Sequence, residues 1–238
     1  MKSLRFTTSK WLDKKMTQTF LDERAAGIDF GEGIVHLHPA LRVAKNNTVA
    51  RNRIVDTYFN TYYRTHGAKM NQRVARVKEQ WKKRELEYVI VTERYFGGFK
   101  FSSGMYVAYA SIINCNPRFL DSKTFQFFYQ KGVPDAIHTV AHELLHFIFF
   151  DFVKKKLPKL AISLPEEALW DVSEIFNVIL LKSPRYQSLI DRRFVRPYPE
   201  HRKFISRAES LYKTSGSAKE FIIRLAQLIS RQKQKGEK

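Results

Sequence analysis

The run from Thr139 to Phe150 limits what this chain can fold into more than any other stretch. It contains no Gly or Pro, and its apolar residues recur at helical spacing, so it predicts a helix. On a helix, His142 and His146 leave the same face about one turn apart. Two imidazole nitrogens at that spacing can reach one metal ion at roughly 2.0–2.1 Å each. Glu143 is offset from both, which directs its carboxylate towards a water that such an ion would hold.

The apolar surroundings of these three residues favour a metal site. Two histidines on an amphipathic helix can also be ordinary interface residues, and a short pattern of this kind arises by chance. Here, however, the flanking residues are strongly apolar, and burying two imidazoles and a carboxylate without partners would be costly. The sequence therefore favours metal ligation over a simple packing role.

A catalytic zinc ion needs a third protein ligand, and two glutamates compete for that role. The motif helix is expected to continue to Lys156, which lies about 15 Å beyond His146 at 1.5 Å per residue. A return helix that starts near Pro165 covers that distance only around Glu174, which we favour as the third ligand. Glu167 would take this role instead if the motif helix ended soon after His146.

Glu167 and Glu174 share one helix face with Asp171, because the three acids are spaced i, i+4 and i+7. Asp171 is therefore predicted to support the site by a hydrogen bond to a ligating histidine.

The H-E-x-x-H pattern followed by a helix-borne glutamate resembles the gluzincin division of the zincin metallopeptidases, which includes thermolysin and the minigluzincins. The resemblance covers roughly residues 88–181. It implies a zinc-dependent hydrolase that cuts peptide bonds, with Glu143 as general base. It also implies a donor for the oxyanion from beyond the third-ligand helix, for which Tyr198 and His201 are the candidates.

The coarse pattern predicts an α+β, zincin-like fold. Residues 1–86 are expected to form a mainly helical region, and residues 87–238 a metallopeptidase domain with C-terminal helices; a single compact unit is the alternative. Strand-like runs are expected to form a small, mostly antiparallel sheet next to the motif helix: Tyr88–Thr92, Phe99–Phe101 and Met105–Asn114. The last of these runs is predicted to be an edge strand along the substrate cleft. The run from Phe119 to Gln130 is predicted to be helical.

The composition of the chain indicates the size of its core and the compartment in which we expect it. The chain has 238 residues, of which 44% are hydrophobic, so a sizeable core is expected. Its one cysteine, Cys115, excludes an intramolecular disulfide and fits a reducing compartment. We find no secretory signal pattern and no run long enough to span a bilayer, so we expect a cytoplasmic protein. The oligomeric state stays open.

The net charge of +19 indicates attraction to an acidic partner. One helix is predicted to end at Gly67, and a second, from Lys69 to Glu85, is the most basic element. Its apolar residues form a stripe, so its charges are expected to face solvent. A second hypothesis is therefore a regulatory or nucleic-acid-associated protein that keeps a zincin fold and uses this basic helix as its binding surface.

Overall fold

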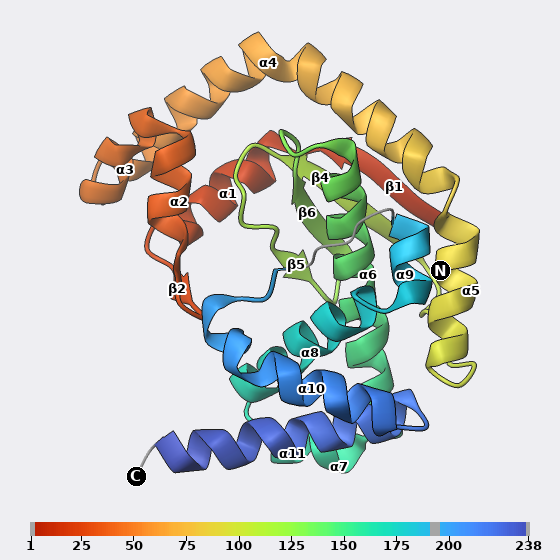
Figure 1. The fold of residues 1–238 in the computed structure, drawn as a ribbon. Helices are drawn as coiled ribbons and strands as arrows, with labels where there is room; N and C mark the ends of the chain where they lie inside the picture. The colour runs from red at the N-terminus through yellow and green to blue at the C-terminus, as the bar shows by residue number, and fades with distance from the viewer. Residues whose placement is uncertain (1–2, 191–195, 237–238) are drawn as a thin grey trace. The chain divides into compact units, whose positions relative to one another are not determined.

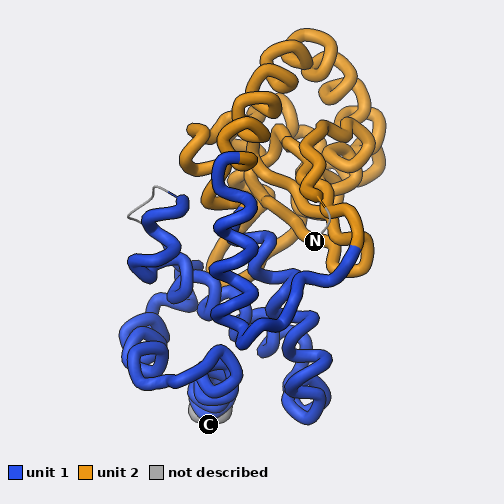
Figure 2. The backbone as a smooth tube through the Cα atoms, turned by 90° about the vertical axis from the view of Figure 1, so that its right-hand side faces the viewer, with its two compact units in different colours: residues 1, 83–103, 141–238 blue, residues 2–82, 104–140 orange. Residues whose placement is uncertain are grey.

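The structure is a computed structural model that describes residues 3–190 and 196–236. The chain divides into two compact units, which Figure 2 shows in different colours. Residues 2–82 and 104–140 form the first, which we call the sheet unit. Residues 83–103 and 141–238 form the second, which we call the helical unit. The segment 104–140, assigned from the sequence to the C-terminal region, thus belongs with the N-terminal residues.

The sheet unit is built on a mixed sheet with the strand order β1-β4-β6-β5. Its strands are β1 (Ser3–Thr8), β4 (Met105–Ser111), β5 (Arg118–Phe119) and β6 (Thr124–Phe128). The pairs β1–β4 and β4–β6 are parallel, and only β5–β6 is antiparallel. The prediction of a mostly antiparallel sheet is therefore wrong. The prediction that residues 105–114 form an edge strand is also wrong, because β1 covers the free side of β4.

Six helical segments and a small hairpin complete the sheet unit (Figure 1). They are α1 (Lys10–Phe20), β2 (Arg24–Ala25), β3 (Ile28–Asp29), α2 (Phe30–Leu37), η1 (Pro39–Leu41), α3 (Arg42–Asn46), α4 (Arg51–Lys82) and the start of α6 (Val133–Lys156). The predicted helix end at Gly67 is wrong, because α4 runs through it. Glycine costs a helix about 1 kcal/mol relative to alanine. Buried residues on both sides of Gly67, among them Phe59 and Met70, hold α4 together across it.

In its described residues, the helical unit contains the rest of α6 and seven further helical segments. They are α5 (Glu85–Tyr95), α7 (Pro158–Ser163), α8 (Glu166–Leu181), α9 (Pro184–Ile190), η2 (Pro199–His201), α10 (Arg202–Thr214) and α11 (Ala218–Gly236). The predicted strand at residues 88–92 is wrong, because this run lies in α5. Two acidic residues in the first turn favour the helix, and Tyr88 packs edge-on against Tyr186 of α9 with ring centroids 5.9 Å apart. No strand forms at residues 99–101.

The run from Phe119 to Gln130 is not helical, and this prediction is also wrong. It forms the end of β5, a turn and β6, whose apolar residues are buried in the sheet. Residues Phe125 to Phe127 of β6 pair in register with residues Ala108 to Ala110 of β4. The pairing with a central strand decides the conformation of this segment.

The motif helix α6 extends from Val133 to Lys156, as the sequence predicts. Proline precedes α8, which starts at Glu166. Among the described residues, α6 is the one helix long and apolar enough to cross a membrane. The prediction that no run is long enough to span a bilayer is therefore wrong. Of the most apolar 18-residue segment of α6, 78% is buried inside the protein. Phe149 of α6 contributes to a core with Phe176 of α8, with ring centroids 5.1 Å apart.

Candidate metal centre

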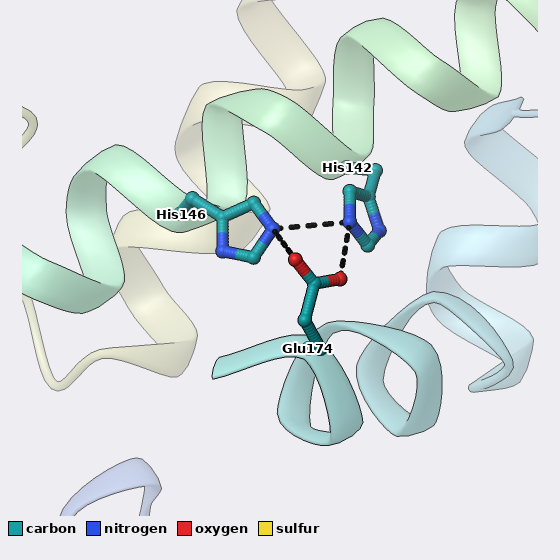
Figure 3. Close-up of side chains that lie close together, drawn as sticks. All are labelled: His142, His146 and Glu174. Carbon is teal, nitrogen blue, oxygen red and sulfur yellow. Dashed lines mark hydrogen bonds and ion pairs between the residues drawn. The ribbon is translucent and has the colours of Figure 1, made fainter. Parts of the chain in front are cut away.

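Two imidazoles and one carboxylate converge between α6 and α8 in the helical unit (Figure 3). His142 and His146 project from one face of α6, and Glu174 reaches them from the middle of α8. The two Nε2 atoms are 3.0 Å apart. Nε2 of His142 is 3.1 Å from one carboxylate oxygen of Glu174, and Nε2 of His146 is 3.3 Å from the other. The structure thus brings together the three residues predicted as ligands.

These separations fit a tetrahedral metal site. With metal–ligand distances of roughly 2.0–2.1 Å, two ligand atoms of a tetrahedral site lie about 3.3–3.4 Å apart. The three contacts, at 3.0, 3.1 and 3.3 Å, are within a few tenths of an ångström of that spacing. Two imidazole nitrogens and one carboxylate form a donor set that suits zinc, and the same set also suits iron(II).

Protons alone do not satisfy this triangle of atoms. A ring nitrogen carries either one N–H or one lone pair, directed along one line in the plane of the ring. Each Nε2 atom here faces two partners, the other imidazole and the carboxylate of Glu174. If both nitrogens are protonated, each N–H can donate to one oxygen of Glu174, which leaves the 3.0 Å contact between the two nitrogens without a hydrogen bond. A cation at the centre attracts all three groups at once, which is why we treat the cluster as a metal centre.

Burial around the cluster leaves one side open. The His146 side chain is fully buried and that of Glu174 is 3% exposed, whereas that of His142 is 17% exposed. Solvent therefore reaches the cluster beside His142. A catalytic metal site requires such an accessible position, whereas a structural site is closed by a fourth protein ligand.

The electrostatics keep Glu174 in its ligating form. Burial by itself would raise the pKa of this carboxyl. The His146 and His142 imidazoles outweigh that effect and hold the pKa well below its ordinary value of 4.5. The carboxylate is therefore ionised and faces both imidazoles as an acceptor.

Neighbouring residues hold the backbone and rings that carry the ligands. The side-chain amide of Asn177 donates a hydrogen bond to the carbonyl of His142 at 3.1 Å, which joins α8 to α6. The hydroxyl of Tyr88 donates to the carbonyl of Ala141 at 2.5 Å. His146 stacks on Phe150, with ring centroids 6.2 Å apart.

The sequence reasoning did not identify Asn177 or Tyr88 as part of the site. Asn177 does carry a local signal, since it is one polar residue in the otherwise apolar end of α8, Ile175–Leu181. Tyr88 carries none, because its role depends on α5 being a helix.

Glu143 is buried, with 4% of its surface exposed. It follows His142 on α6, so its side chain leaves the helix about 100° around the axis from that residue. This places its carboxylate on the neighbouring face of α6 from the two imidazoles. The offset is the one expected of a base that contacts water at the centre without ligating the ion.

The remaining predicted residues fall into two places. Glu167 is exposed in the first turn of α8, about two turns before Glu174, and is not part of the cluster of three. Asp171 instead lies beside His201, whose Nε2 is 2.8 Å from a carboxylate oxygen. The ring of Tyr198 is 5.5 Å from that of His201. Asp171 thus partners a histidine other than the two expected ligands.

No protein-family model matches the chain, and neither the curated proteins nor the solved structures contain a match. The function is therefore argued from the residues of the site alone.

Proposed function

We propose that the protein is a zinc-dependent metallopeptidase. The observation that carries the proposal is the convergence of His142, His146 and Glu174, with three contacts of 3.0 to 3.3 Å between ligand atoms and one accessible side. A carboxylate follows the first histidine on the same helix, which is the arrangement of zinc peptidases of the H-E-x-x-H type. The single cysteine is no competing nucleophile, since burial raises the pKa of Cys115 to about 12.

The residues of the chain would divide the work between them. His142, His146 and Glu174 would hold the zinc ion, which supplies Lewis acidity towards the peptide carbonyl and towards water. Glu143 would accept a proton from the attacking water and pass it to the leaving amine. The substrate is a peptide or an unstructured protein segment.

We assign Tyr198 and His201 as candidate donors to the oxyanion that forms on the substrate carbonyl. Asp171 engages Nε2 of His201, and the Trp170 ring lies 5.5 Å from the imidazole, so the histidine has a defined orientation. A hydrogen bond from one such donor contributes about 2.7–4 kcal/mol to transition-state stabilisation, equivalent to roughly 10²–10³ in kcat. Replacing Tyr198 by Phe and His201 by Ala, one at a time, measures which of them has this role.

The experiment that tests the function combines metal analysis with one conservative variant. Protein purified without added metal should contain about one zinc ion per chain by elemental analysis, and it should cleave an unfolded protein such as denatured casein. Glu143→Gln should keep the zinc and lose activity by roughly 10²–10⁴-fold. Hydrolysis that survives this change contradicts the catalytic assignment, and iron in place of zinc contradicts the metal assignment.

A second candidate is a regulatory or nucleic-acid-associated role for the basic part of α4. Residues Met70, Val74, Val77 and Trp81 are buried on one side of this part, while basic residues are exposed on the other: Lys69, Arg76, Lys78 and Lys82. Such a surface would bind phosphates with a strong dependence on salt. Retardation of random DNA by wild type and by Glu143→Gln, lost on raising the salt concentration, would support this role. We place either activity in the cytoplasm, consistent with a single reduced cysteine.

A further inference from the structure

One cavity of the helical unit lies apart from the metal-ligand candidates. It has a volume of about 320 Å³, within the range of pockets that bind small molecules. Its walls come from α5, from the junction of α8 and α9, and from the loop between α10 and α11. None of the three metal-ligand candidates lines it.

Two arginines give this cavity a strongly positive rim. Arg94 of α5 and Arg185 of α9 both line it, and no acidic residue does among those that the structure describes. Within the described residues, no ion pair joins either guanidinium to a carboxylate. Each guanidinium presents a planar fork of N–H donors that matches a phosphate or a carboxylate. Two such groups on one cavity favour the binding of an oxyanion.

The loop between α10 and α11 forms one wall and is held in one conformation by its own hydrogen bonds. The backbone N–H of Gly216 donates to the carboxylate of Glu220 at 2.9 Å, and the N–H of Glu220 donates to the hydroxyl of Ser217 at 3.2 Å. Arg224 bonds the same carboxylate and the Thr214 carbonyl, which offsets the charge of Glu220. The N-terminus of α11 begins at this loop, and its first N–H groups carry partial positive charge.

The rest of the wall is apolar and aromatic. Tyr95, Tyr186 and Tyr212 line the cavity together with Val91 and Leu180. Tyr186 is buried and its hydroxyl donates to Thr92 at 2.9 Å, whereas Tyr95 and Tyr212 are partly exposed, so these two rings form the accessible aromatic wall. Flat apolar walls of this kind suit a planar organic group.

We propose that this cavity is a binding site for a small organic anion, with one phosphate or carboxylate group held by Arg94 and Arg185 and a planar apolar body against the tyrosines. The proposal is independent of the peptidase function, because it uses none of the metal-site residues. The oxyanion is the chemistry shared by the two ligand types, and the choice of probe distinguishes them.

Isothermal titration of the full chain with three probes tests this site: phenyl phosphate, benzoate and inorganic phosphate. We expect saturable binding of phenyl phosphate or of benzoate, and the tighter of the two identifies the anion. Inorganic phosphate, which lacks the planar body, should bind at least about tenfold more weakly, a difference of ~1.4 kcal/mol. Arg94→Ala and Arg185→Ala should each weaken the aromatic probe by about tenfold or more.

Lys213→Ala is the matched control, because Lys213 is exposed next to Tyr212 and does not line the cavity. It should change affinity by less than about twofold, since it removes only a nearby charge. Both arginines are exposed, so their variants should melt at the wild-type temperature. The proposal is overturned if no probe saturates, if all three variants weaken binding equally, or if inorganic phosphate binds as tightly as phenyl phosphate.

Discussion

Asp13 of the sheet unit and Glu174 of the helical unit are both buried carboxylates, and they differ in the polar groups that surround them. In the sheet unit, Asp13 is fully buried on α1 and accepts hydrogen bonds from neutral donors: the hydroxyl of Tyr63 at 2.7 Å, the amide of Gln126 at 2.6 Å and the N–H of Ile112 at 3.1 Å. In the helical unit, Glu174 faces two imidazole nitrogens that also face each other.

The pKa values of the two carboxyls shift in opposite directions for this reason. Burial raises the pKa of Asp13 to about 6, and its hydrogen bonds oppose that rise without cancelling it. The imidazoles lower the pKa of Glu174 despite its burial. Donors and acceptors match around Asp13, which is typical of a structural cluster. Around Glu174 two imidazole nitrogens and two carboxylate oxygens lie close together, an arrangement of the kind that can hold a metal ion.

Removing Glu174 should produce the largest functional change. Glu174→Ala leaves only the two imidazoles as ligands, so we expect less than about a tenth of an equivalent of bound zinc and a loss of hydrolysis of roughly 10³-fold or more. Asp13→Asn is the matched control, because it changes a buried carboxylate of the other unit and should leave the zinc content unchanged. Retention of zinc and activity in Glu174→Ala would contradict the assignment of the third ligand, and Glu167→Ala then tests the alternative.

Removing Asp13 should produce the largest change in stability. Asp13→Ala leaves four buried donors without their acceptor, those of Ser111, Tyr63, Gln126 and Ile112. Each unpaired donor costs about 1–3 kcal/mol, so we expect a loss of roughly 3 kcal/mol or more in the free energy of unfolding. Chemical denaturation of the metal-free protein measures this difference. Asp56→Ala is the control, because that carboxylate is 58% exposed and its loss should cost less than about 1 kcal/mol. If Asp13→Ala and Asp56→Ala lower the free energy of unfolding equally, the proposed structural role of Asp13 is wrong.

The metal cluster was predictable from the sequence, because its geometry is local to two helices. His142 and His146 share a face of any helix that contains them, and the absence of a breaker before Lys156 correctly predicted the length of α6. That length pointed to Glu174 rather than Glu167. The contacts that support the ligands were not predictable in the same way, since Tyr88 acts through the packing of α5.

The sheet was predicted poorly, because its pairing joins residues distant in the sequence. Ser3 of β1 lies opposite Met105 of β4, and parallel pairs of this kind leave no local turn signal. The β-branched run in α5 and the aromatic run in β6 were both misassigned for a related reason. Their conformations follow from burial against partners elsewhere in the chain, which overrides intrinsic propensity.

The pH dependence of stability should distinguish the sheet unit's carboxylate from other acids. The folded pKa of Asp13, about 6, exceeds its ordinary value of 3.8, so the folded protein binds more protons between these values than the unfolded chain does. The part of the stability that comes from this raised pKa is therefore fully present below pH 4 and is lost as the pH rises through 6, by up to about 3 kcal/mol.

Denaturation of wild type and Asp13→Asn at several pH values between 4 and 7 measures this linkage. The difference in unfolding free energy between the two proteins should shift in favour of the variant as pH rises, and it should become constant above pH 7. A difference that stays constant from pH 4 to 7 would show that the donors keep Asp13 ionised throughout.

Loss of the contact between Asn177 and the His142 carbonyl should have the smallest of these effects. It tests whether the contacts around the candidate metal centre position its ligands. Asn177→Ala removes the bond that joins α8 to the backbone of a ligand but leaves all three ligand atoms in place. Loss of such a supporting contact typically weakens metal binding about 10–100-fold, so we expect a tenfold higher zinc dissociation constant, or ~1.4 kcal/mol, in a chelator competition. Ser173→Ala is the control: its hydroxyl donates to the Trp170 carbonyl within α8, so zinc affinity should stay within about twofold. If both variants lose affinity equally, the contact acts through the stability of α8 and not through the position of His142.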